Sequence, residues 1–399
     1  MPQTLDGLRV LELGQLVAAP SAGRIFADFG ADVIKVEPLD GDPLRQWGNQ
    51  APSGSSWWWM TQARNKRLIA VNLKTSVGQE IIRKLAGQVD VILENLRPGT
   101  LDAWHLGYDQ ISEINPHIIY ASISGFGQTG PYRDRPGFGN IAEAMGGIRY
   151  ITGFPDRPPV RTGMSLGDEL AALQAVIGVL LALYRREREP ARRGEHIDVA
   201  LTESVLSITE ALIPEYLNAS IVQERTGNQL LRAAPSNTYP TLDGGWIAVG
   251  ANSSKTFHLL MQAMDREDLA QDERFKNNAG RVAHAAILDR IIAEWTGQYA
   301  MEELMDILIP IGVPAGPVMT AKDIVDDAQV KARALIEYVL GNGSEEVGML
   351  GVLPKLSKYP GQIRWAGGSI GQDTDKVLQE FVEASSRDLA AWREMGIIR

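Results

Sequence analysis

Cysteine is absent from this 399-residue chain. Its absence excludes disulfides, thiolate nucleophiles, zinc–thiolate sites and iron–sulfur clusters. Basic charge is also in short supply, because 39 Lys and Arg residues stand against 49 Asp and Glu residues, a net charge of −10. We therefore expect no nucleic-acid partner, although a local basic pocket could still hold one phosphorylated ligand.

Long hydrophobic runs are also missing. The most apolar helix candidate covers residues 170–184 and is interrupted by Gln174. This stretch is shorter than the roughly 20 apolar residues that span a bilayer, so it is predicted to be a buried core helix. The first residues lack the basic and apolar regions of a signal peptide. A cytoplasmic protein with no membrane partner is the expectation.

Several ligand-binding and catalytic motifs are absent. The turn after the first predicted strand reads LELGQLVAAPSAGR rather than G-x-G-x-x-G, which disfavours a dinucleotide-dependent dehydrogenase. The sequence contains neither a G-x-x-x-x-G-K-[ST] phosphate loop nor a G-x-S-x-G nucleophile elbow. Its five histidines are scattered without metal-ligand spacing, so no metal site is expected.

Strand and helix patterns alternate through the first 125 residues. Short apolar strands are predicted at 8–13, 31–36, 68–73, 89–93 and 118–123. A capping-box pattern, Ser76-x-x-Gln79, predicts the start of the helix after the third strand. Such alternation is typical of a parallel sheet with helices on its faces, which binds ligands at the carboxyl ends of its strands.

The length of the chain predicts two domains. A Gly- and Pro-rich stretch at 125–147 is too long for a simple connection, which suggests a functional role. A strand at 196–200 and a helix at 202–217 follow it. We predict an α/β fold with a Rossmann-like parallel-sheet domain (1–220), a smaller α/β domain (221–325) and a C-terminal segment (326–399) that returns to the first domain.

One carboxylate has an unusual setting. Asp168 follows Gly167 directly and precedes the most apolar helix. An aspartate at this position is commonly a plain helix cap. Alternatively, the positive helix end holds the carboxylate ionised in a cleft, where it could attack an activated acyl group and form a mixed anhydride.

Basic and aromatic residues gather near the predicted strand ends. Arg64, Lys66 and Arg67 precede the third strand, Lys74 follows it, and Arg97 follows the fourth. Their shared placement favours a site for a phosphorylated ligand. Residues 57–59 are three consecutive tryptophans, which cannot all be buried in one regular element, so at least one is expected to line a pocket or an interface.

Together these segments resemble the class III CoA-transferases, the group of formyl-CoA transferase and carnitine CoA-transferase. The resemblance extends from Leu8 to Leu378. Its motifs are GADVIKVEP (30–38), NKRLIAVNLK (65–74), ENLRPG (94–99), NPHIIYASISGFGQTGPY (115–132), GD (167–168), HIDVALTESV (196–205), GVPAGPV (312–318) and GQDTDKVL (371–378).

The resemblance implies an enzyme that moves CoA between carboxylates, with Asp168 as the nucleophile. It uses no metal and no permanently bound cofactor, because CoA itself is the cosubstrate. The implied CoA-binding residues are Gln15, Leu16, Val17, Ala18, Val71, Lys74, Asn95, Leu96 and Arg97. Family members can carry arginine where this chain has Pro38 and Ala103, so Arg97, Arg64 or Arg67 is expected to substitute.

Substrate and assembly are also implied. The motif sequences are similar to those of members that use succinyl-CoA and a second dicarboxylate. Residues 227–240 lack the glycine-rich lid of formyl-CoA transferases. Trp57, Phe138 and Arg232 are candidate pocket residues, and Arg232 or Arg135 could bind a distal carboxylate. The family also implies an interlocked homodimer.

Two alternatives remain open. Racemases of 2-methylacyl-CoA share the fold but carry a histidine where this chain has Phe138, so one face of the α-carbon would lack a proton carrier. A non-catalytic CoA-binding protein would tolerate loss of Asp168, which is present.

Overall fold

The computed structural model describes residues 3–341 and 345–399. The chain forms two compact units. Unit 1 comprises Met1–Ile148, Thr162–Ile213 and Gln329–Arg399, and unit 2 comprises Arg149–Arg161 and Pro214–Ala328. Residues 149–161 therefore group with unit 2, whereas the sequence-based boundaries assign them to the first domain.

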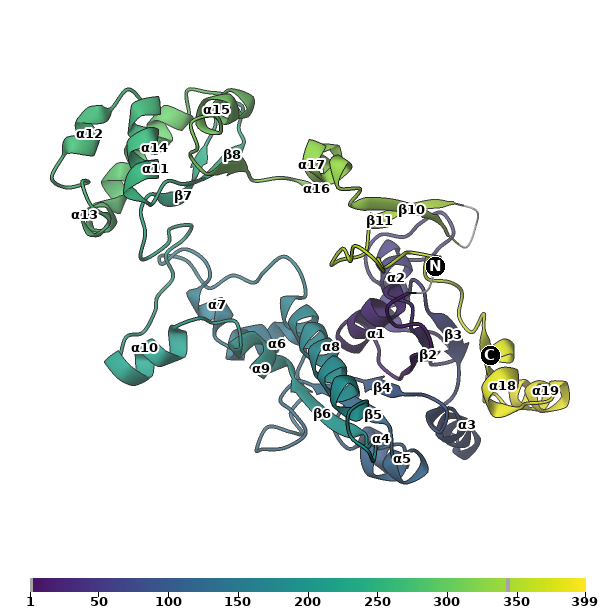
Figure 1. The fold of residues 1–399 in the computed structure, drawn as a ribbon. Helices are drawn as coiled ribbons and strands as arrows, with labels where there is room; N and C mark the ends of the chain where they lie inside the picture. Colours follow the sequence, from purple (N-terminus) through teal and green to yellow (C-terminus); the bar gives the residue numbers. More distant parts are fainter. Residues whose placement is uncertain (1–2, 342–344) are drawn as a thin grey trace. The chain divides into compact units, whose positions relative to one another are not determined.

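Unit 1 contains a six-stranded parallel sheet, which confirms the predicted sheet (Figure 1). Its strand order is β3-β2-β1-β4-β5-β6, so the order reverses between β1 and β4. Ligands bind at such a reversal in open parallel sheets. The strands are β1 (Arg9–Glu12), β2 (Asp32–Glu37), β3 (Arg67–Ala70), β4 (Val91–Glu94), β5 (Ile119–Ser124) and β6 (Glu195–Ala200).

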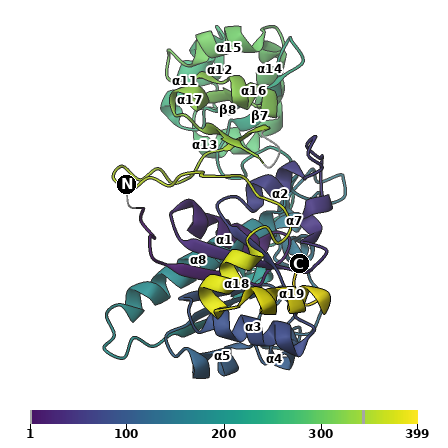
Figure 2. The same cartoon turned by 90° about the vertical axis from the view of Figure 1, so that its right-hand side faces the viewer.

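Helices cover both faces of this sheet (Figures 1 and 2). The apolar side chains of both faces are buried beneath them. On one face, α1 (Ala18–Asp28) and α8 (Leu166–Arg186) pack against residues such as Val10, Val91 and Ile119. On the other face, α3 (Ser76–Ala86), α5 (Tyr108–Ile114) and α18 (Thr374–Val382) pack against Leu11, Ile92 and Tyr120. Burial on both faces explains why the strands read as continuous apolar runs.

Two local predictions need correction. Thr75, rather than Ser76, is the N-cap of α3, because its side chain accepts a hydrogen bond from the Gly78 N–H. The helix predicted over 202–217 is interrupted, giving α9 (Leu201–Leu206) and α10 (Leu212–Ala219). Glu210 lies between them with φ +50°, a left-handed conformation that an α-helix does not accommodate.

Further elements complete unit 1. The C-terminal segment adds α18 and α19 (Ser386–Glu394) to one face of the sheet, together with an antiparallel hairpin, β10 (Ile336–Leu340) and β11 (Glu346–Leu350). The remaining described elements are η1 (Pro43–Gln46), α2 (Trp57–Gln62), α4 (Thr100–Ala103), α6 (Gly139–Met145) and α17 (Ala328–Ala332), whose first residue falls in unit 2.

Unit 2 has its own antiparallel sheet and core. Strands β7 (Ser236–Pro240), β8 (Trp246–Gly250) and β9 (Ala315–Pro317) are ordered β7-β8-β9. Buried side chains such as Phe257, Leu288 and Leu304 pack between the helices and this sheet. The helices include α7 (Ile148–Ile151), whose first residue falls in unit 1, α11 (Ser254–Ala263), α12 (Glu267–Gln271), α13 (Asn278–Ala283), α14 (Ala285–Thr296), α15 (Met301–Leu308) and α16 (Ala321–Asp326).

Helix α8 is only partly a core helix. Among the residues that the structure describes, it is the one helix long and apolar enough to cross a membrane by length and composition. Core helices of soluble proteins also meet this criterion. One side of α8 packs on the sheet, but Leu173, Ile177, Leu180, Leu181 and Tyr184 are exposed. The prediction of a buried core helix is therefore confirmed for the side that faces the sheet and was wrong for this side.

Candidate active site

The first turn of α8 carries Asp168 against the backbone of α6. A Cβ atom added to Gly139 would lie 2.1 Å from Asp168 Oδ2, and one added to Gly167 would lie 2.9 Å from the Gly139 carbonyl oxygen. A side chain at position 167 would therefore clash with backbone, and one at position 139 would displace the Asp168 carboxylate. This contact gives the Gly-rich stretch at 125–147 a structural purpose, because the stretch brings Gly139 against the Asp168 carboxylate.

The surroundings of Asp168 oppose its ionisation. Burial, followed by the charges of Glu169 and Glu143, raises the pKa of the Asp168 carboxyl to about 6. Glu143 is fully buried, and its Oε1 accepts a hydrogen bond from the Gly167 N–H at 3.4 Å. The helix N-terminus was expected to hold the carboxylate ionised, but burial and the two acidic neighbours outweigh that effect. At neutral pH most Asp168 side chains are still ionised.

The loop after β1 is held by side chains that follow two other strands, Asp42 after β2 and Asn95 after β4. Asn95 accepts a hydrogen bond from the Gln15 N–H at 2.8 Å and donates one to the Gln15 carbonyl at 2.9 Å. Asp42 accepts a hydrogen bond from the Leu16 N–H at 3.2 Å. Leu16 itself has φ +62°, an uncommon conformation for leucine, so these contacts stabilise a strained turn.

A cavity of about 310 Å³ opens beside this loop, at the carboxyl ends of β1 to β4. Four of the predicted CoA-binding residues line it, namely Gln15, Val71, Lys74 and Leu96. Pro38 lines it as well. The structure thus brings together side chains that lie as much as 81 residues apart in the sequence (Gln15 to Leu96).

The other predicted CoA-binding residues lie outside the cavity lining. Val17 and Ala18 are buried at the start of α1. Asn95 forms hydrogen bonds with the backbone of Gln15 and does not line the cavity itself. The exposed Arg97 lines a separate cavity of about 380 Å³ together with Arg133 and Arg135.

Three basic residues before β3 cannot serve as free phosphate ligands. Arg64 is buried and pairs with Asp28 at 2.7 Å, and Lys66 is buried and pairs with Glu12 at 2.7 Å. Arg67 lies at the amino end of β3, where it pairs with Asp32 and Glu380. The expectation that Arg64 or Arg67 substitutes for a missing arginine was wrong, because both side chains are engaged in ion pairs within unit 1.

The candidate pocket residues are dispersed. Trp59 is 1% exposed and donates its indole N–H to the Gly368 carbonyl at 3.0 Å, whereas Trp57 and Trp58 are exposed. Phe138 is 67% exposed and directly precedes Gly139, beside Asp168. Arg232 belongs to unit 2, where it pairs with Glu215.

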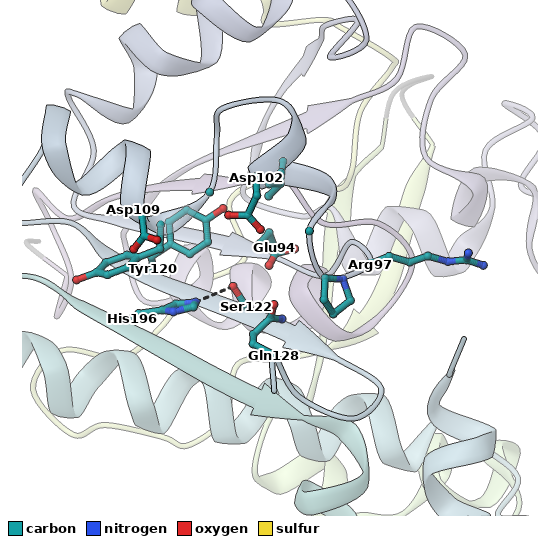
Figure 3. Close-up of a pocket in the computed structure, with 13 residues that line it drawn as sticks. Glu94, Arg97, Asp102, Asp109, Tyr120, Ser122, Gln128 and His196 are labelled. Atoms are coloured by element: carbon teal, nitrogen blue, oxygen red, sulfur yellow. Dashed lines mark hydrogen bonds between the residues drawn. The ribbon is translucent and has the colours of Figure 1, made fainter. Parts of the chain in front are cut away.

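A second, smaller cavity of about 110 Å³ is lined by residues of β4, β5 and β6 (Figure 3). Ser122 Oγ lies 3.0 Å from His196 Nε2, and burial raises the pKa of the Glu94 carboxyl to about 7. Arg97 points away from these groups (Figure 3). Tyr120, on the same strand face as Ser122, packs on the side of the sheet opposite α8. This cavity is therefore separate from Asp168.

The comparisons with known proteins decide the family. Residues 5–374 match the model of CoA-transferase family III. The chain belongs to that family.

Related CoA-transferases match over almost the whole chain. The chain is 46% identical to a succinyl-CoA–D-citramalate CoA-transferase of Chloroflexus aurantiacus, covering 100% of this chain and 98% of that protein. It is 31% identical to the human succinyl-CoA:glutarate CoA-transferase, covering 99% and 90%. A CaiB/BaiF family protein from Brucella suis has a similar structure, with a TM-score of 0.86, 34% identity and coverage of 96% and 100%.

Some groups around the candidate site of this class III CoA-transferase escaped the analysis of its sequence. Ser21, Gln62 and Glu143 approach the loop after β1 or the first turn of α8 only through tertiary contacts. Glu169 alone had a sequence signal, because it stands beside Asp168 in the first turn of the same helix.

Proposed function

We propose that this CoA-transferase moves CoA from succinyl-CoA to a dicarboxylate acceptor through covalent intermediates on Asp168. The names of several relatives support the substrates, since they act from succinyl-CoA on D-citramalate, L-malate or glutarate. The observation that carries the mechanism is the position of the Asp168 carboxylate, packed against Gly139 at the start of α8 with a raised pKa.

The reaction begins with attack of an Asp168 carboxylate oxygen on the thioester carbonyl of succinyl-CoA. A C–O bond forms, the C–S bond breaks, and CoA thiolate leaves a succinyl–aspartyl anhydride. The thiolate then attacks the aspartyl carbonyl, so that an aspartyl-CoA thioester forms and succinate departs. The acceptor carboxylate repeats both steps in reverse. Each intermediate is an activated acyl group, so no step needs a metal or a permanently bound cofactor.

The cavity beside the Gln15 loop is the proposed binding site for CoA. Lys74 supplies a positive charge for a phosphate group of CoA, while Val71 and Leu96 supply apolar contacts to the rest of the CoA molecule. Arg97 adds a second cation at the neighbouring cavity. Trp57, Phe138 and Arg232 remain candidates for contact with the acyl group or the acceptor.

We also propose that the enzyme is a cytoplasmic homodimer, interlocked as in the family it resembles. The exposed apolar side of α8 supports a subunit contact, because Leu173, Ile177, Leu180, Leu181 and Tyr184 recur at helical spacing along it.

Intact-mass spectrometry tests the proposed chemistry. The protein is incubated with succinyl-CoA, and a CoA-sized adduct, with loss of water, is expected on the wild type. Asp168→Ala is expected to show none, whereas Asp306→Asn, at an exposed aspartate of unit 2, should form it normally. Discharge of the adduct by one acid from a panel of dicarboxylates identifies the acceptor. A wild type that forms no adduct with any acyl-CoA contradicts the proposal.

A further inference from the structure

A chain of hydrogen bonds runs from the CoA-binding loop to the neighbour of Asp168. Gln62 Nε2 donates to the Val17 carbonyl at 3.0 Å and to Ser21 Oγ at 2.6 Å. Ser21 Oγ donates in turn to Glu169 Oε1 at 2.9 Å. Helices α2, α1 and α8 each contribute one side chain, so three separate elements meet at this chain of bonds.

Burial makes this arrangement specific. Ser21 is fully buried and Gln62 is 3% exposed, so each polar atom must find its partner inside the protein. Both amide hydrogens of Gln62 are used, which leaves Ser21 to direct its single O–H toward Glu169. The Glu169 carboxylate is thereby fixed in the first turn of α8, next to Asp168, instead of extending freely into solvent.

The charges that face Asp168 and Glu169 come from three helices. Glu143 of α6 and Glu169 of α8 both disfavour the ionised Asp168 carboxylate. Arg24 of α1 acts on Glu169 and pairs with Asp28 at 3.6 Å. Ionised Asp168 therefore stands beside two other carboxyl groups. This repulsion ends when Asp168 becomes an anhydride or a thioester, because both derivatives are uncharged at the aspartyl group.

We propose that Glu169 is a positioning residue, which Ser21 and Gln62 hold beside Asp168 so that its charge favours the covalent aspartyl intermediates over the free carboxylate. The inference rests on the proposed CoA transfer through Asp168. It assigns a purpose to a second acidic residue that no step of the transfer reaction itself requires. It also ties the CoA-binding loop, through the Val17 carbonyl, to the electrostatics of the nucleophile.

Glu169→Gln is the decisive variant, since glutamine keeps an oxygen that can accept the Ser21 hydrogen bond but removes the charge. The rate of adduct formation from succinyl-CoA is measured against pH, and the equilibrium fraction of adduct is measured at pH 8. We expect the acidic side of the pH–rate profile (the acid limb) to move to lower pH by about half to one unit. The equilibrium constant for adduct formation should fall by about three- to tenfold. One shift in the Asp168 pKa predicts both numbers.

Two further variants separate positioning from a general structural effect. Ser21→Ala releases Glu169 and should shift the acid limb in the same direction by a smaller amount, whereas adding it to Glu169→Gln should shift the limb no further. Glu187→Gln, at the exposed far end of α8, should leave both readouts unchanged.

The outcomes distinguish the two proposals. A normal wild-type adduct with an unshifted acid limb and an unchanged adduct fraction in Glu169→Gln overturns this inference and leaves the proposed function standing. A further shift in the double variant also overturns it, because Ser21 would then act independently of Glu169. A wild type without any adduct overturns both.

Discussion

In the proposed mechanism Asp168 must lose its proton before it attacks the thioester, so the pH dependence of the reaction is expected to report on this one carboxyl. Burial and the neighbouring Glu169 and Glu143 raise its pKa to about 6. We expect kcat/KM for succinyl-CoA to fall as the pH is lowered through about 6, tenfold per pH unit well below it. Circular dichroism at the same pH values checks that the protein stays folded. A flat profile between pH 7 and pH 5 would argue against Asp168 as the nucleophile.

Glu94 offers a separate test at the residue scale, on stability rather than catalysis. Burial raises its pKa from 4.5 to about 7, so between these values the folded protein keeps a proton that the unfolded chain has lost. Stability contributed by this group is therefore present below about pH 4.5 and lost as the pH rises to about 7.

Glu94→Gln should remove this pH dependence, because the amide stays uncharged. We expect the variant to be more stable than the wild type above pH 7, by about 1–3 kcal/mol of unfolding free energy, and equally stable near pH 4.5. Urea unfolding at the two pH values measures the difference. Equal stability at both would show that the carboxyl titrates near its ordinary pKa in the folded protein.

The positions of single residues could be predicted from the sequence where they depend on the neighbouring strand, but not where they depend on a partner distant in the sequence. Val71 and Lys74 come soon after the end of β3, so their place at the carboxyl edge of the sheet could be predicted. Arg64 and Lys66 also flank β3, yet both turn inward to Asp28 and Glu12, which lie 36 and 54 residues away. The hydrophobic pattern of a sequence indicates where a strand lies, but it does not show which carboxylate forms an ion pair with a buried basic side chain.

At the scale of elements, the loop after β1 depends on Asn95. Asn95→Asp should keep the bond from the Gln15 N–H but lose the donor to the Gln15 carbonyl and oppose that oxygen with a charge. Because Gln15 lines the cavity proposed to bind CoA, we expect KM for succinyl-CoA to rise by about tenfold or more, while KM for the acceptor acid changes little.

Asn115→Asp is the matched control for this loop. Asn115 also donates two hydrogen bonds to backbone carbonyls, those of Ala86 and Val89, but it does so outside the cavity lining. Its substitution should lower the melting temperature without a specific change in KM for succinyl-CoA. If both variants raise that KM equally, Asn95 acts on general stability and not on the loop.

Element boundaries show the same division between local and distant causes. The parallel strands could be predicted within a few residues because their apolar runs are buried on both faces. Helix α8 was predicted to be a buried core helix from its composition, but the sheet covers only one of its sides. An apolar helix face indicates that the face is covered, but it does not indicate whether the covering residues belong to the same chain or to a second subunit.

At the scale of the whole molecule, the exposed side of α8 therefore predicts association. Ile177 and Leu181 lie one helical turn apart on this side, and charges placed there would have to be buried in a subunit contact. We expect the wild type to sediment as a dimer in analytical ultracentrifugation and Ile177→Glu/Leu181→Glu to shift strongly toward monomer. Leu242→Glu, at an exposed leucine of unit 2, serves as the control and should leave the dimer intact.

A monomeric wild type, or a double variant that remains fully dimeric, would show that α8 is not the subunit contact. Because neither substitution touches Asp168 or the cavity that Gln15 lines, any loss of activity that accompanies dissociation would indicate that the second subunit completes the active site.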